Sequence, residues 1–280
     1  AVTADGVRDA IRFGKRRADL PARRFRRLVA DGTLQVQVQG TGVGQVNGLA
    51  VIQAGPLVYG FPARISATIG PGTAGVINIE READLSGAIH TKGFYILGGL
   101  LRTLLRTNHP LAFDASVAFE QSYGGIDGDS ASGAEVCCLL SALTDIPLSQ
   151  EVAMTGAIDQ VGNILAIGGV NEKIEGFFDV CKSRGLDGSH AVVIPRDNVK
   201  HLMLREDVVE AVDNGKFAVY AVRHIDEALA ILTGLEAGER DQHGKFPKDS
   251  VNGLAERQLT KYAELRQSFS ASPDSDEDNG

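Results

Sequence analysis

The residues best placed to do chemistry lie in a glycine-rich stretch, DGDSASG, at positions 127–133. Ser130 stands there among small residues and acids, directly before an apolar helical pattern that runs to Thr144. A serine at such a turn can be a nucleophile, or it can be an ordinary helix cap that accepts a hydrogen bond from a backbone N–H. A nucleophilic serine needs a base within hydrogen-bond reach, which the rest of the chain has to supply.

Two serine-hydrolase motifs come close to this stretch, and both differ in detail. The hydrolase elbow G-x-S-x-G needs a glycine where this chain has Ser132. The GDSGG of chymotrypsin-like proteases belongs to an all-β chain, whereas helical and strand patterns alternate here. The histidines stand at element ends or on polar stretches, not in a glycine-rich or acidic setting: His90, His109, His190, His201, His224 and His243. A Ser-His hydrolase remains an alternative on the sequence alone.

A lysine is the other available base. Lysine has an unperturbed pKa of about 10.4, and burial in an apolar setting lowers it by several units because the ammonium is disfavoured there. Lys173 follows a double glycine in AIGGVNEKIEGFF and falls in the first turn of a predicted helix. A cation is disfavoured at a helix N-terminus, so this position needs a reason. The alternative is a solvated first-turn lysine.

The surrounding pattern predicts the elements that would position these residues. Period-two alternation indicates strands at 33–40, 44–53 and 64–70, and another strand at 115–123 leads to the Ser130 loop. Beyond a hairpin with DQVGN at its turn, helical and strand patterns alternate to about residue 235. The fold class predicted is α/β (mixed α+β), with a β-rich N-terminal half, an alternating α/β C-terminal half and helical extensions at both ends. The predicted divisions are a basic helical arm (1–32) broken at Pro21, a catalytic-type domain (33–236), a helical extension beyond the core (237–270) and a disordered acidic tail (271–280).

Composition narrows the function classes. The chain has 280 residues, a formal net charge of −8 and 43% hydrophobic residues, as expected of an ordinary globular protein. It contains no apolar run long enough to span a membrane. The three cysteines, Cys137, Cys138 and Cys181, fall in predicted helices and indicate core residues in a reducing, cytoplasmic compartment. The arm carries nine basic residues up to position 31, a density that makes nucleic-acid binding possible but is more typical of a solvated helix or connector.

Several ordered motifs resemble the proteolytic domain of the Lon protease family. The family's D-G-x-S-A loop, its SALT-x-IP helix end, its AMTG-x-I and its IGG-xx-EK are similar to segments of residues 127–176. Upstream, GQVNGLAV at 44–51 resembles the family's GQVTGLAW strand, and HTKGFYILGGLL at 90–101 is also similar. DGDSAS in place of DGPSAG suggests the bacterial LonB-like group. The resemblance covers about residues 34–235.

The resemblance implies roles for individual residues. In the family the serine of the first motif and the lysine of the last form a catalytic dyad, here Ser130 and Lys173, with Thr155 beside the lysine. Asp127, Gly128 and Asp129 are supporting candidates in the loop, and Glu120 is a weaker one. The strand carrying Gly48, Leu49, Ala50 and Val51 would pair with extended substrate. The implied activity is serine endopeptidase hydrolysis of unfolded or damaged proteins.

The resemblance also implies partners outside this sequence. Lon proteases carry an ATPase that uses ATP and Mg²⁺, but no G-x-x-x-x-G-K-[ST] occurs here, so no cofactor is expected in this chain. The start AVTADG favours a fragment of a longer polypeptide with the ATPase in the same chain, over a stand-alone peptidase. A hexameric ring is expected. Related domains that have lost the dyad serve as assembly or nucleic-acid-binding scaffolds, and this is the second hypothesis.

Overall fold

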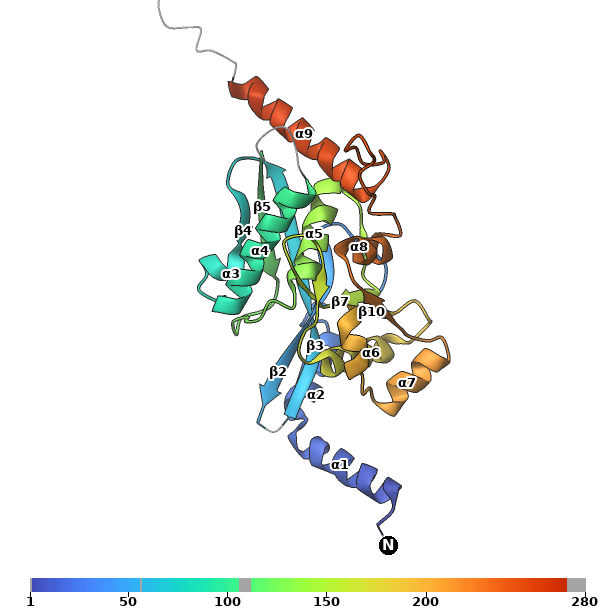
Figure 1. The fold of residues 1–280 in the computed structure, drawn as a ribbon. Helices are drawn as coiled ribbons and strands as arrows, with labels where there is room; N and C mark the ends of the chain where they lie inside the picture. Colours follow the sequence, from blue (N-terminus) through green and yellow to red (C-terminus); the bar gives the residue numbers. More distant parts are fainter. Residues whose placement is uncertain (1, 56, 106–111, 271–280) are drawn as a thin grey trace, which may run out of the picture.

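The computed structural model describes residues 2–55, 57–105 and 112–270, and its centre is a seven-stranded mixed sheet (Figure 1). The strands are β2 (Gln45–Ala54), β3 (Leu57–Pro71), β4 (Gly75–Asn78), β5 (Phe113–Phe119), β7 (Val152–Met154), β10 (Ala191–Pro195) and β11 (Ala218–Val222). They lie in the order β11-β10-β7-β2-β3-β5-β4. Strands β2, β3 and β5 form an antiparallel group, whereas β2, β7, β10 and β11 are parallel to one another and β4 is parallel to β5. The predicted mixed α/β class is confirmed.

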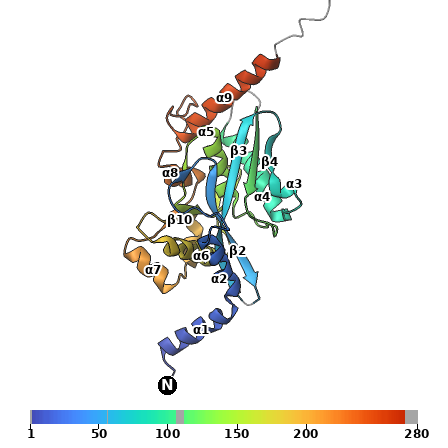
Figure 2. The same cartoon turned by 180° about the vertical axis from the view of Figure 1, so that it is seen from behind.

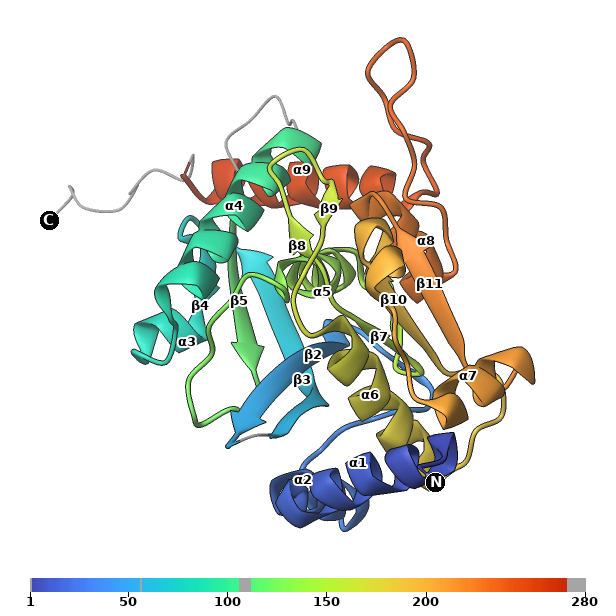
Figure 3. The same ribbon diagram turned by 60° about the horizontal axis from the view of Figure 1, so that its bottom comes forward.

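Helices cover both faces of the sheet. Along β10, Ala191 and Val193 face one apolar cluster, and Val192 and Ile194 face another, because successive side chains of a strand point to opposite faces. The first cluster takes residues from α4, α5, α8 and α9, and the second from α2, α6 and α7. Figure 3 shows α2 beside α6, with α4 and α9 at the other end of the molecule. The helices are α1 (Ala4–Ala18), α2 (Leu20–Ala30), α3 (Ile79–Glu82), α4 (Ala88–Leu104), α5 (Ser132–Thr144), α6 (Val170–Arg184), α7 (Glu206–Asp213), α8 (Ile225–Thr233), α9 (Val251–Ser270) and a 3₁₀ helix (Arg196–His201). None of these described helices is both long and apolar enough to cross a membrane.

Two short two-stranded sheets accompany the large sheet in the described part of the chain. Strand β1 (Thr41–Gly42) pairs with β6 (Leu148–Ser149), and β8 (Ala157–Ile158) pairs with β9 (Ile164–Leu165). The turn between β8 and β9 is the predicted DQVGN, in which Asp159 accepts hydrogen bonds from the backbone of Val161 and Asn163. The preceding β7 is not part of this hairpin, because it lies between β2 and β10 in the large sheet.

The β2–β3 hairpin is held against α6 by two glycines. A Cβ built on Gly60 of β3 would lie 2.0 Å from the carbonyl oxygen of Glu172, and one built on Gly176 of α6 would lie 2.0 Å from the carbonyl oxygen of Gly60. Only residues without a side chain allow backbones this close. Figure 2 shows the outer part of the hairpin extending past the sheet toward α2.

One predicted strand is wrong. Residues 33–40 show the predicted alternation, with Leu34, Val36 and Val38 facing inward, but they form no strand. Side chains from other segments bind their backbone instead. Asn47 Nδ2 donates to the carbonyl oxygen of Gln37, and His190 Nε2 donates to the carbonyl oxygen of Val38. Period-two burial therefore reflects an extended chain packed on the protein, not pairing with another strand.

The two ends also differ from expectation. The arm forms two helices, as predicted, but they meet at Asp19, and Pro21 lies in the first turn of α2, where a missing N–H is harmless. Helix α9 lies within the predicted C-terminal extension, yet Val251, Ala255 and Leu259 are fully buried in the main apolar cluster. It is therefore part of the core, not an extension beyond it. The predicted tail at 271–280 lies outside the described residues.

Candidate active site

Three side chains from separate elements meet at one point. Lys173, the fourth residue of α6, donates from Nζ to Ser130 Oγ at 2.7 Å and to Thr155 Oγ1 at 3.0 Å. Ser130 lies in the loop before α5, and Thr155 directly follows β7. The structure thus brings together the serine, lysine and threonine singled out in the sequence, although 43 positions separate Ser130 from Lys173.

The threonine hydroxyl is oriented by a second bond. Thr155, which is fully buried, donates from Oγ1 to the carbonyl oxygen of Ser130 at 3.1 Å. A hydroxyl has one proton, so Thr155 can only accept from the lysine amine. With one amine hydrogen directed at Thr155, the lone pair of a neutral Lys173 is free to face Ser130. The backbone N–H of Gly156 also binds the Ser130 carbonyl, at 2.8 Å, which fixes the loop to the end of β7.

Burial changes the proton affinity of the lysine. The Lys173 side chain is 2% exposed, and this burial lowers its pKa to about 8, although the nearby Asp129 carboxylate opposes the change. Roughly a tenth of the molecules then carry a neutral amine at pH 7, compared with well under a thousandth for an ordinary lysine. Lys173 is therefore suited to accept a proton near neutral pH.

A groove leads to these residues. It has a volume of about 570 Å³ and is lined by Leu49–Ile52 of β2, by 121–128 and by Ser130 and Lys173. Strand β2 pairs with β7 only at Asn47 and Gly48, while its pairing with β3 continues to Ala54. From Leu49 onward the other edge of β2 has no strand partner among the described residues, and an extended peptide can add to such an edge.

Comparison with known proteins identifies the domain. Residues 116–234 match the family model of the Lon protease (S16) C-terminal proteolytic domain. The chain is 44% identical over 237 residues to a Lon protease homolog of Haemophilus influenzae, with 84% of this chain and 39% of the relative covered. The chain belongs to the Lon protease family.

Other relatives agree with this assignment. A Lon protease homolog of Escherichia coli K12 is 43% identical over 216 residues, covering 76% of this chain and 37% of that protein. An archaeal Lon protease of Thermococcus kodakarensis is 32% identical over 199 residues, covering 70% of this chain and 28% of that protein. The chain thus spans less than two fifths of the length of the two bacterial relatives.

In the Lon domain, Asp127 holds the Ser130 loop to α4 and not to the lysine. Its Oδ1 accepts hydrogen bonds from the backbone N–H groups of Ile89, His90 and Gly128, at 3.1, 3.3 and 2.9 Å. These backbone bonds lower the pKa of Asp127, the one from Gly128 most strongly. Asp127 caps the start of α4 from a distant part of the chain, so its place in the site is that of an anchor. The loop turns at Gly128, whose φ of +94° favours glycine.

The other two acidic candidates, Asp129 and Glu120, differ in their distance from the site. Asp129 is close enough to Lys173 to raise its pKa, and its carbonyl oxygen accepts from Ser132 at the start of α5. Glu120 lines a separate cavity and accepts a hydrogen bond from Ser66 Oγ. The structure therefore brings Asp129 to the site and leaves Glu120 outside it.

The described histidines of the Lon domain make their hydrogen bonds away from Ser130. His90 is 1% exposed and lies between Ser86 Oγ, at 2.9 Å from Nδ1, and Glu135 Oε1, at 3.0 Å from Nε2. Hydrogen bonding and charge from Glu135 raise its pKa in spite of burial, which acts in the opposite direction. The acid beside His90 comes from α5, and His190 and His224 also lie beside acids, Asp187 at 3.4 Å and Asp226 at 3.1 Å. The local sequence around His90 did not indicate its acidic setting. Among the described residues no histidine contacts Ser130, and His109 lies outside them.

Proposed function

We propose that this chain is the proteolytic part of a Lon-type serine endopeptidase that hydrolyses peptide bonds of unfolded or damaged proteins. The observation that carries the proposal is the 2.7 Å contact between Ser130 Oγ and a lysine whose burial lowers its pKa to about 8. A lysine held this way has little structural reason to be buried, because burying a cation without a carboxylate partner is unfavourable.

The proton and the electron pairs move as follows. Neutral Lys173 takes the proton of Ser130, and Oγ attacks the substrate carbonyl carbon to form a tetrahedral intermediate. Lys173 then gives that proton to the leaving amine, which departs and leaves the acyl group on Ser130. A water molecule, deprotonated by Lys173, attacks the acyl-enzyme, and its proton returns to Ser130 as the acid is released.

Backbone groups support the developing negative charge. The N–H groups of Ser130 and Ala131 have no hydrogen-bond partner among the described residues, and they lie at the start of α5. Free N–H groups at a helix start suit an oxyanion. The unpaired edge of β2 from Leu49 to Val51, with Gly48 at its beginning, would hold the substrate as an added strand.

The wider setting of the chain is part of the same proposal. We propose that the chain works with an ATPase module in the same full-length polypeptide, in the cytoplasm, within a hexameric ring, and that it belongs to the bacterial LonB-like group. ATP and Mg²⁺ would serve that module, and unfolded protein would be the substrate. The length of the relatives beyond the matched part leaves room for a further module, and their names as Lon proteases or homologs support the protease function.

The scaffold alternative has weaker support. A nucleic-acid-binding scaffold would use the basic arm, but three arm arginines pair with acids of the protein itself: Arg8 with Glu206, Arg23 with Asp19 and Arg26 with Asp179. A domain serving only as a scaffold would also have no need of a buried lysine on a serine.

Variants of the two residues test the proposal. Ser130→Ala and Lys173→Met should each lower hydrolysis of a fluorogenic peptide and of an unfolded protein by at least about 1000-fold, with the circular dichroism spectrum unchanged. Lys182→Met, on the same helix but with its side chain 54% exposed, is the matched control and should keep full activity. A fluorophosphonate should label Ser130 of the wild-type chain. Near-normal activity in Lys173→Met would mean that Lys173 is not the base, and the histidines would then have to be tested for that role.

A further inference from the structure

The N-terminal arm forms part of the groove that contains Ser130. Phe25 of α2 lines this groove together with Leu34 and Val36, which follow the arm. The Phe25 ring lies 4.9 Å from the ring of Phe61 on β3, centroid to centroid, and Phe61 lines the same groove. The arm thus supplies apolar surface on the side of the groove formed by the β2–β3 hairpin.

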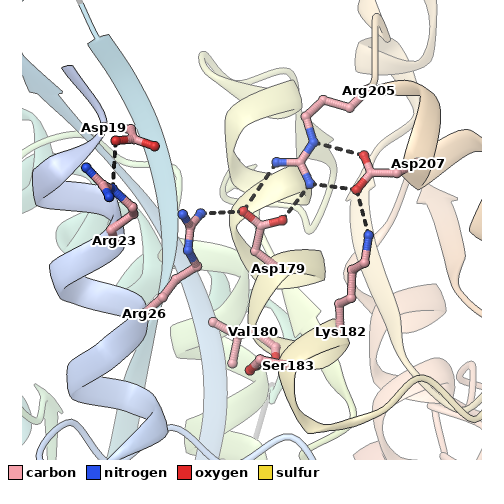
Figure 4. A network of polar contacts seen from close by, with 9 residues as sticks. All are labelled: Asp19, Arg23, Arg26, Asp179, Val180, Lys182, Ser183, Arg205 and Asp207. Atoms are coloured by element: carbon pink, nitrogen blue, oxygen red, sulfur yellow. Dashed lines mark hydrogen bonds and ion pairs between the residues drawn. The ribbon is translucent and has the colours of Figure 1, made fainter. Parts of the chain in front are cut away.

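The arm is fixed in this position by contacts to α6, the helix that carries Lys173. Arg26 reaches across from α2 and donates to Asp179 of α6 at 2.7 Å, while Arg23 pairs with Asp19 within the arm (Figure 4). The Asp179 side chain is 16% exposed and also accepts from Arg205. Ala22 and Val29 of α2 are buried, and Val29 belongs to the apolar cluster that also contains residues of α6.

The segment after the arm is hydrogen-bonded to the segment that leads to Ser130. The backbone N–H of Gln35 donates to Gln121 Oε1 at 2.7 Å, and Gln121 Nε2 donates to the carbonyl oxygen of Thr33 at 2.9 Å. Gln121 lies in the segment that leads to Ser130 and itself lines the groove. The wall made by residues 25–36 is therefore connected to the hairpin, to α6 and to the Ser130 segment.

We propose that Phe25 is a specificity-determining residue: with Phe61 it forms a subsite for a large apolar side chain of the substrate, such as leucine. The proposal rests on the proposed peptidase function, because the subsite belongs to the same groove. An extended peptide added to the edge of β2 sends alternate side chains to one face, and the Phe25–Phe61 pair presents aromatic surface to them. Because the arm carries Phe25, the position of the arm sets the selectivity of the groove.

Binding to a catalytically silent chain tests the subsite directly. In a Ser130→Ala background, fluorescence anisotropy compares two labelled decapeptides of alanine, serine and threonine, one with a central leucine and the other with alanine in its place. The leucine peptide should bind at least about tenfold more tightly, and Phe25→Ala should reduce this preference to about twofold or less. Phe13→Ala, which removes a ring that is 64% exposed on α1, is the matched control and should leave the preference unchanged.

A second pair of variants tests the docking of the arm. Arg26→Ala should reduce the leucine preference as Phe25→Ala does, whereas Arg23→Ala, with the same change in charge on the same helix, should not. A preference that is the same with and without the Phe25 ring, including no preference in either chain, overturns the proposal.

Labelling separates this inference from the proposed function. With Ser130 restored, a small fluorophosphonate should react equally with the wild-type chain and Phe25→Ala, because it does not need the subsite. If neither chain reacts while the leucine preference still depends on Phe25, the peptidase function fails and the binding subsite stands. If both react and the preference does not depend on Phe25, the subsite fails and the peptidase function stands.

Discussion

The charge of a single residue, Lys173, should control the pH dependence of the reaction. Only its neutral form can accept the Ser130 proton, so kcat/KM for a peptide should rise with pH and level off above about pH 8. The Asp129 carboxylate raises the pKa of the lysine, in opposition to burial. Asp129→Asn removes this charge and should therefore move the rising limb to lower pH.

The control is a carboxyl-to-amide change outside the groove. Glu120→Gln alters a carboxylate that lies in a separate cavity, and its rising limb should coincide with that of the wild-type chain. The measurement is kcat/KM between about pH 6 and pH 10 for the three chains. A limb that stays in place or moves to higher pH in Asp129→Asn would show that this carboxylate does not act on the base.

Among the elements, the approach of β3 to α6 should govern the position of the lysine. Gly60→Ala places a Cβ 2.0 Å from the Glu172 carbonyl oxygen and 2.6 Å from the Lys173 nitrogen, both backbone atoms that cannot rotate away. The hairpin and helix α6 must move apart, and we expect α6 to shift and to carry Lys173 with it. A displacement of about 1 Å at a catalytic group can cost about 100-fold in rate, and we expect kcat to fall by that order.

Gly70→Ala is the matched control on the same strand. A Cβ at Gly70 meets no atom within 4 Å, so this variant should keep its activity and its melting temperature. Both variants should be measured for kcat and for thermal unfolding, so that loss of activity can be told from loss of fold. Activity within about twofold of wild type in Gly60→Ala would mean that the hairpin yields and α6 does not.

The helices and strands also show how far the structure could be predicted from the sequence. Local patterns located most helices and strands, and the motifs selected Ser130, Lys173 and Thr155, which the fold brings together. Residues 33–40 had a strand pattern, but their partners are side chains from distant segments, which periodicity does not reveal. The acid beside His90 likewise lies 45 positions away on another helix. Contacts between residues far apart in the sequence could be predicted only where the resemblance to a known family implied them.

For the whole molecule, the question is whether the C-terminal helix belongs to one cooperative unit. Helix α9 packs on α5, the helix that begins just after Ser130, and Leu259 of α9 lies fully buried in the cluster that fills that face of the sheet. The two apolar clusters lie on opposite faces of the same sheet, so the loss of packing on one face should destabilise both clusters.

Leu259→Ala should therefore lower the free energy of unfolding of the entire domain by about 2–5 kcal/mol, as expected for a fully buried leucine. Leu265→Ala, on the same helix but 39% exposed, should change it by less than about 0.5 kcal/mol. Denaturant unfolding followed by circular dichroism and by peptide hydrolysis should give one shared transition, at lower denaturant in Leu259→Ala only. An unchanged main transition in Leu259→Ala would mean that residues 237–270 are an extension independent of the core, as the sequence alone had indicated.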